Sequence, residues 1–161
     1  MITEPNEIIL INLTASLIIA IISQIVSHKF TRHRDYSKSF YEEINRIDKE
    51  LDDLISDVVQ YWVRDRDKDD TLIETLLKYN FEKIEDRVMC MKQHVKASHL
   101  VDDVMESLST FRQHALGGTF ESASRTKDKT RSEECSRFCM IVRRKLSGLQ
   151  VRSGSIKSLS R

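Results

Sequence analysis

Glycine and proline are scarce in this sequence. Its 161 residues include four glycines and one proline, and the proline lies at position 5. Tight turns between β-strands depend on these residue types, so their scarcity favours long helices joined by a few loops. The composition therefore predicts an all-α fold.

Familiar catalytic motifs are also missing. The chain contains no glycine-rich phosphate loop, no His-Glu-x-x-His or Glu-x-x-His pair, and no nucleophile elbow around a serine. In several large enzyme classes these patterns position the phosphate, the metal or the nucleophile. We therefore expect neither an enzymatic activity nor a cofactor.

Charge is absent from one long stretch, Ile8 to Ser27, which also lacks glycine and proline. A helix of this length covers about 30 Å, the thickness of the hydrocarbon core of a bilayer. A buried helix of a soluble protein would show a polar face, whereas isoleucine, leucine and valine occur here on every side. A cleaved signal peptide is disfavoured because the positive residues follow the apolar run. We expect residues 8–27 to form a single transmembrane helix.

Charged residues flank this stretch asymmetrically. Glu4 and Glu7 precede it. The basic residues that follow it are Lys29, Arg32, Arg34 and Lys38. Because positive residues stay on the cytoplasmic side of a membrane, we expect residues 1–7 to be extracytoplasmic and the chain after Ser27 to lie in the cytoplasm.

Small and polar residues follow one stripe along the predicted anchor: Asn12, Ser16, Ala20 and Ser23. At about 100° per residue they fall within one arc of roughly 80°. Such side chains let helices approach closely and hydrogen-bond in lipid, although a single serine can instead bond to its own helix. The whole stripe predicts a homo-oligomer that associates through this face.

The remaining chain is expected to form a cytosolic helical domain over residues 28–149, followed by a basic, serine-rich, disordered tail over residues 150–161. From Phe40 to Tyr61 apolar residues recur at spacings of four and three, which predicts a helix that continues to about Arg64. Acidic residues flank this stripe, so it is expected to pack against helices of its own domain, such as the basic last helix, and not against an identical copy.

Start and stop signals divide the rest into three helices. Thr71 and Glu74, and again Thr130 and Glu133, have the spacing of a capping box. Ser98 is a further predicted cap, Gly117-Gly118 a predicted helix end, and Gly148 a predicted end of the last helix. The short connections favour an antiparallel four-helix bundle. The run from Arg64 to Asp70 is predicted to be a solvated turn, and Trp62 to lie in the core.

Basic residues gather near the start of the last predicted helix: Lys127, Lys129, Arg131 and Arg137, with Arg125 before them. A helix N-terminus offers unpaired N–H groups and the positive end of the helix dipole. These residues therefore predict an anion or phosphate site, with a solvated basic loop as the alternative.

Cysteines allow one further hypothesis. Cys90 and His94 are spaced i, i+4, as are Cys135 and Cys139, so two facing helices could hold zinc. Free cysteine is also a common small core residue, and in a cytosolic domain it stays reduced. We favour the core interpretation and predict no bound metal.

This combination of features resembles the small membrane effectors of type III CRISPR systems. An uncharged anchor with a polar stripe, basic juxtamembrane residues and a small helical domain with a basic cluster carry the resemblance. It implies a homo-oligomer such as a tetramer, activated by a cyclic oligoadenylate, that disturbs the inner membrane and does not bind duplex nucleic acid. Lys127, Lys129, Arg131 and Arg137 would hold the ligand phosphates. The alternative is a passive membrane-tethered scaffold or adaptor for a partner protein.

Overall fold

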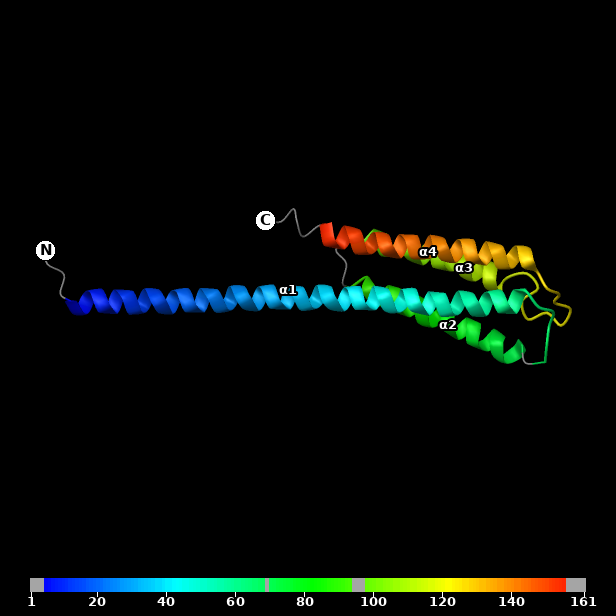
Figure 1. Cartoon of the computed structure of the whole chain (residues 1–161), viewed down its shortest axis with the longest axis horizontal. Helices are drawn as coiled ribbons and strands as arrows, with labels where there is room; N and C mark the ends of the chain where they lie inside the picture. The colour runs from blue at the N-terminus through cyan, green and yellow to red at the C-terminus, as the bar shows by residue number, and fades with distance from the viewer. Residues whose placement is uncertain (1–4, 69, 94–97, 156–161) are drawn as a thin grey trace. The chain divides into compact units, whose positions relative to one another are not determined.

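A computed structural model of the chain describes the backbone of residues 5–68, 70–93 and 98–155. Side chains are described from residue 16 to residue 151, apart from 32–33, 36–37, 69 and 94–97. The helices are α1 (Pro5–Trp62), α2 (Asp70–Met91), α3 (Ser98–Leu116) and α4 (Lys129–Ser155) (Figure 1). These ranges contain no β-strand, so the predicted all-α class is confirmed.

The chain divides into two compact units, Met1–Ser39 and Phe40–Arg161. In the first unit α1 leaves its apolar side chains exposed, for example Leu17 at 63% and Ile19 at 64%. Within the described part of the chain, no helix has the length and the hydropathy that crossing a membrane requires. Residues 8–15 of the predicted anchor lie outside the residues whose side chains are described.

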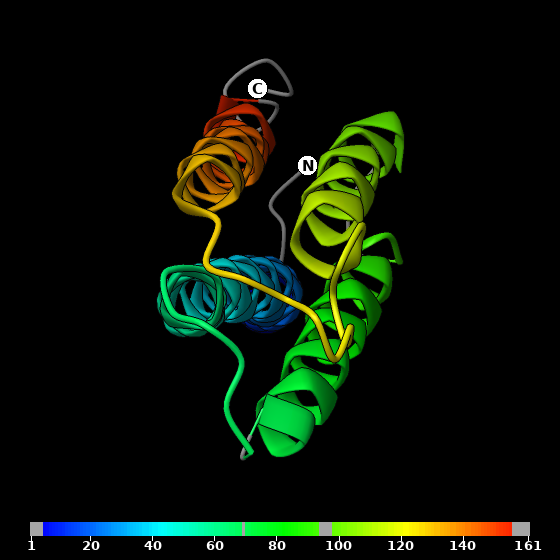
Figure 2. The same cartoon turned by 90° about the vertical axis from the view of Figure 1, so that its right-hand side faces the viewer.

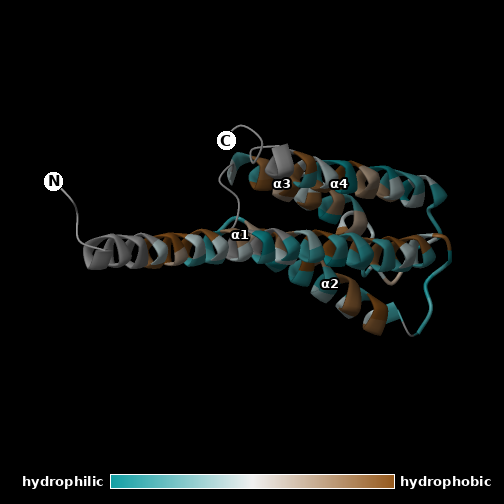
Figure 3. Cartoon of the chain, turned by 60° about the vertical axis from the view of Figure 1, so that its left-hand side comes forward, coloured by the Kyte–Doolittle hydropathy of each residue, from teal (hydrophilic) through white to brown (hydrophobic). Residues whose placement is uncertain are grey.

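The second unit has a single apolar core, which all four helices line. The predicted stripe of α1 is buried from Phe40 to Tyr61, and Trp62 follows it into the core as expected. The remaining helices contribute residues at the same spacings, including Leu77, Phe81 and Ile84 from α2, Val104, Leu108 and Phe111 from α3, and Val142, Leu146 and Leu149 from α4. Within this unit, both apolar and hydrophilic residues therefore occur along each helix (Figure 3).

Ion pairs link neighbouring helices of this unit. Arg87 of α2 contacts Glu43 of α1 at 2.6 Å. Arg143 of α4 contacts Asp48 of α1 through two nitrogens, at 2.7 and 2.8 Å. The expectation that the acidic flank of α1 packs against the basic last helix is therefore confirmed. These pairs are partly exposed, and ion pairs near the surface contribute little stability compared with the apolar core.

The helix starts differ from the two predicted capping boxes, which are wrong. α2 begins at Asp70, and the carboxylate of Glu74 is buried and accepts a hydrogen bond from Tyr61. At α4 the cap is Asp128, whose Oδ1 accepts the N–H of Arg131 at 2.9 Å. Aspartate, like threonine, is a favoured N-cap residue, and Asp128 lies directly before the first residue of α4.

Glycine marks one helix end and not another. α3 ends at Leu116, and Gly118 adopts the left-handed conformation (φ +62°), as predicted for a helix stop. Gly148 instead lies inside α4, which continues to Ser155, so the predicted end there and a disordered tail beginning at residue 150 are wrong. An interior glycine costs about 1 kcal/mol, which the buried Leu149 beside it offsets. Residues 156–161 of the predicted tail lie outside the described residues.

Candidate functional site

The most concentrated polar contacts lie where α1 ends and α2 begins. We call this group the α1–α2 junction and define it as Tyr61, Trp62, Asp70, Glu74 and Arg125. All five side chains are buried, although three of them carry charge. Charged groups are rarely buried unless other groups pair with them, so the partners of each decide what the junction can do.

Arg125 reaches the junction from the loop between α3 and α4. Its guanidinium donates hydrogen bonds to the carbonyls of Tyr61 and Arg64, each at 2.7 Å, and forms a buried ion pair with Asp70. It also lies 4.0 Å from the centre of the Tyr61 ring. One side chain therefore holds the end of α1, the start of α2 and the loop before α4 together.

Asp70 is fully buried at the first position of α2. Its carboxylate also accepts the N–H of Asp67 at 2.9 Å and pairs with Arg64 at 2.5 Å. Burial alone would raise the pKa of this carboxyl, but the Asp67 hydrogen bond and the two guanidinium groups lower it below its ordinary value. Asp70 is therefore a fixed negative charge at neutral pH.

Tyr61 and Glu74 form the second polar contact of the junction. The tyrosine hydroxyl donates to Glu74 at 2.7 Å and accepts the N–H of Glu121 at 3.2 Å. Arg66 also contacts Glu74, at 3.1 Å. Burial, above all, raises the pKa of Tyr61 to about 12, so the phenol stays neutral at physiological pH. The contact is a structural one, because the Tyr61 hydroxyl and the Glu74 carboxylate are both buried and both have hydrogen-bond partners within the protein.

Trp62 connects the junction to the predicted anion site. Its indole N–H donates to the carbonyl of Ala115 at 3.0 Å, and the Arg131 guanidinium lies 4.5 Å from the centre of its ring. Arg131 also donates to the carbonyl of Gly117 at 2.8 Å. The end of α3 and the start of α4 are held at Trp62 in this way, and Gly118 provides the space that the guanidinium occupies.

The predicted anion-site residues fall into two groups. Arg131 is half-buried and has internal partners, and Arg125 belongs to the buried junction. Lys127, Lys129 and Arg137 are exposed, and Arg137 lies 5.5 Å from the ring centre of Phe138. Three exposed cations therefore lie near the start of α4, together with Arg131, which has internal partners.

The predicted stripe in the first unit is described only in part. Ala20 and Ser23 are exposed on α1, and Ser16 is also exposed. The side chain of Asn12 lies outside the described residues. Association through this stripe stays a prediction.

The cysteines of the zinc hypothesis lie in different environments. Cys135 and Cys139 are buried in the core, Cys90 is exposed, and His94 lies outside the described residues. No group of three or more candidate metal ligands occurs among the residues with described side chains. Burial raises the pKa of Cys135 to about 12 and that of Cys139 to about 11, as expected for thiols packed among apolar groups.

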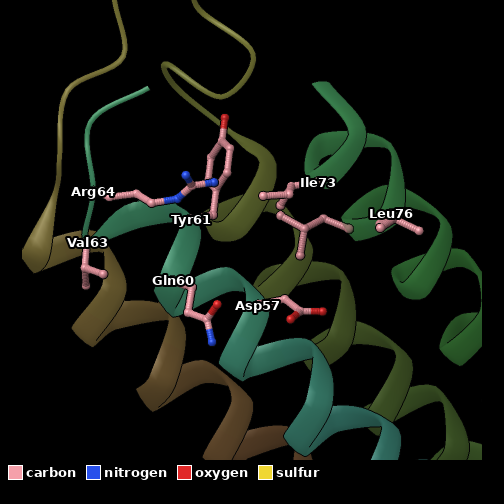
Figure 4. A pocket seen from close by; sticks show the side chains of 8 residues that line it. Asp57, Gln60, Tyr61, Val63, Arg64, Ile73 and Leu76 are labelled. Carbon is pink, nitrogen blue, oxygen red and sulfur yellow. The ribbon is translucent and has the colours of Figure 1, made fainter. Parts of the chain in front are cut away.

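An open pocket lies between α1 and α2, next to the junction (Figure 4). Its volume is about 550 Å³. Its apolar wall consists of Val63, Ile73, Leu76 and Leu77, and its polar side chains are Asp57, Gln60, Tyr61 and Arg64. Leu76 is 48% exposed and Val63 47%, so part of this apolar surface faces solvent.

Sequence reasoning missed the buried charges of the junction. The run from Arg64 to Asp70 was expected to be a solvated turn, and Arg125 was expected to lie beside an anion site or in a solvated loop. One signal was present: Asp70 and Glu74 continue the spacing of the α2 core residues Leu77 and Phe81, at intervals of four, three and four. Extending the stripe backwards would have placed both carboxylates on the buried face.

The chain matches no family model, no curated protein and no solved structure. The resemblance to membrane effectors of CRISPR systems therefore stays a prediction.

Proposed function

We propose that this protein is a single-pass membrane effector of the bacterial inner membrane. Residues 8–27 anchor it, and residues 40–149 form an antiparallel four-helix bundle in the cytoplasm. The bundle binds an anionic cyclic oligonucleotide, the protein associates into a homo-oligomer, and the anchors then perturb the membrane. It acts by binding, without catalysing a reaction.

The anchor carries this proposal. The stretch from Ile8 to Ser27 holds no charged residue, and in its described part the side chains of Ile18, Ile22 and Ile25 are all about half-exposed. Water is a poor solvent for so much apolar surface, and a bilayer is a good one. The acidic residues before it and the basic residues after it support a cytoplasmic bundle.

Ligand binding rests on the cations near the start of α4. Lys127, Lys129 and Arg137 are exposed, and none of the three forms an ion pair with a residue whose side chain is described, so each can turn towards a phosphate. Arg131 is held against Trp62 and supplies positive charge at a fixed position. In a symmetric oligomer these cations recur around an axis, which suits a cyclic ligand with repeated phosphates.

A titration of the full-length protein in detergent micelles tests this step. Cyclic oligoadenylates of different ring sizes are added, and the dissociation constant is measured at two salt concentrations. We expect one ring size to bind, and its affinity to fall as salt rises, because exposed charges are screened. Substitution Lys127→Glu together with Lys129→Glu should weaken binding at least tenfold. Exposed Lys49 on α1 provides the matched control, and Lys49→Glu should leave the affinity unchanged.

A membrane-tethered adaptor is the second candidate. The observation that favours it is the open apolar pocket between α1 and α2, which has the character of a protein-docking surface. If no cyclic oligoadenylate binds the full-length protein while the protein remains folded, the effector proposal is refuted and the adaptor becomes the leading function.

A further inference from the structure

The α1–α2 interface of the second unit is closed by ion pairs over only part of its length. Arg87 of α2 contacts Glu43 and Glu50 of α1, at 2.6 and 3.2 Å. Lys83, one turn earlier in α2, contacts Glu50 at 2.8 Å. Glu43 and Glu50, which are seven residues apart on α1, therefore both meet a cation of α2.

Further along α1 this pattern stops. Asp57 lines the open pocket, and α2 presents Ile73 and Leu76 there in place of a lysine or arginine (Figure 4). Arg64, which also lines the pocket, is already paired with the buried Asp70. Among the residues with described side chains, no cation is paired with Asp57.

Two independent features at the pocket thus lack a partner within the protein. The first is the negative charge of Asp57, whose pKa is raised by partial burial and by the neighbouring carboxylate of Asp53. The second is exposed apolar surface: Leu76, which lines the pocket, is 48% exposed, and Leu72, one turn before it on α2 and outside the pocket lining, is 65% exposed. A ligand that covers the leucines and brings a cation to Asp57 would satisfy both.

We propose that the pocket between α1 and α2 binds a basic amphipathic helix of a partner protein. The apolar face of that helix packs on Ile73, Leu72 and Leu76, and a lysine or arginine beside this face pairs with Asp57. Helices that dock in grooves present apolar residues at spacings of three and four, and Ile73, Leu76 and Leu77 of α2 have the same spacings. This inference deepens the adaptor function proposed above by naming the class of partner.

The opposite end of the unit does not offer the same chemistry. A smaller pocket between α3 and α4, of about 210 Å³, is lined by Leu100, Leu149, Arg144 and Lys145, with Asp103. Its two cations would repel a basic helix. A basic helix is therefore expected to bind only at the pocket between α1 and α2. In the view along the helices, α2 and α4 lie at opposite corners of the unit (Figure 2).

The probes are two designed 18-residue helical peptides. Both have leucine at positions i, i+3, i+4 and i+7, and one carries lysines beside the leucines where the other carries glutamates. Binding to the full-length protein in detergent micelles is measured by fluorescence anisotropy, with empty micelles as the background. We expect the lysine peptide to bind at least tenfold more tightly than the glutamate peptide.

Charge-reversal substitutions test whether Asp57 makes the contact with the peptide. Asp57→Lys should weaken the lysine peptide at least tenfold and strengthen the glutamate peptide. Asp86→Lys is the matched control, because Asp86 is exposed on α2 outside the pocket and its substitution changes the net charge equally. Equal effects of the two substitutions, or no binding of either peptide to the wild-type protein, would overturn the proposal.

The outcome is separable from that of the effector proposal. Asp57 lies on α1 and is not part of the proposed oligonucleotide site near the start of α4, so Asp57→Lys should leave the affinity for the cyclic oligonucleotide unchanged. Messenger binding without peptide binding would reject the docking helix alone. Peptide binding that passes the charge-reversal test without messenger binding would support the adaptor and reject the effector.

Discussion

Removing the guanidinium of Arg125 should destabilise the second unit more than any change of an exposed arginine. Arg125→Leu leaves the carbonyls of Tyr61 and Arg64 without this donor, and it removes the ion pair of the fully buried Asp70. Breaking a buried pair by deleting one partner costs about 3–5 kcal/mol. Because Asp70 keeps Arg64 and the N–H of Asp67, we expect the lower end of this range.

Trp62 provides the assay, since it is the single tryptophan of the chain and is fully buried at the junction. The free energy of unfolding of the full-length protein is measured from its fluorescence during urea titration in micelles. Arg46→Leu is the control, because this arginine is 61% exposed and pairs with Glu43 on the same helix. Its loss should cost less than about 1 kcal/mol.

A second substitution separates the lost ion pair from lost packing. In Arg125→Leu with Asp70→Asn, the buried carboxylate is no longer charged, so part of the lost stability should return. The reasoning is refuted if Arg125→Leu changes the free energy of unfolding by less than about 1 kcal/mol, the size expected for an exposed pair. It is also refuted if the double substitution lowers the free energy of unfolding by the full sum of the two single substitutions, because no stability would then have returned.

Three further predictions concern single groups. Because the pKa of Asp70 is lowered by folding, its contribution to stability is present above its ordinary value of 3.8 and is lost as the pH falls below that value; the pH dependence of the urea midpoint in this acid range should be smaller in Asp70→Asn. Cys135, whose pKa is raised to about 12, should react with iodoacetamide at pH 8 far more slowly than exposed Cys90, and peptide mass spectrometry under native conditions that finds equal labelling would contradict its burial. Gly118→Ala should cost about 1–2 kcal/mol in the same urea titration, because its φ is +62° and the new Cβ would lie 2.6 Å from Arg131; an unchanged midpoint would show that the loop rearranges freely.

The helical framework followed from local patterns. The spacing of four and three from Phe40 to Tyr61 depends only on the geometry of one helix, and the same holds for the core stripes of α2, α3 and α4. Gly117-Gly118 ended α3 as expected because the left-handed conformation is available to glycine at little cost. Gly148 shows the limit of this rule, since packing of the residues around it outweighs the helix propensity of one position.

The contacts of the candidate site depended on distant residues. Arg125 and Asp70 are 55 positions apart, and nothing in either local sequence indicates that the two charges neutralise each other in the core. The same holds for Arg131, whose contacts with Trp62 and Gly117 the local sequence does not indicate. The sequence therefore locates the basic residues, but the packing of the helices is needed to tell which of them are buried and which are exposed.

The most direct test of the effector proposal uses the full-length protein reconstituted in liposomes that hold a self-quenching dye. Cyclic oligoadenylates are added from the side that the bundle faces, and dye release is followed by fluorescence. The proposal predicts release with the ring size that binds, and none without ligand or with the Lys127→Glu, Lys129→Glu variant. Release that does not depend on the ligand, or its absence although the ligand is bound, would contradict the account.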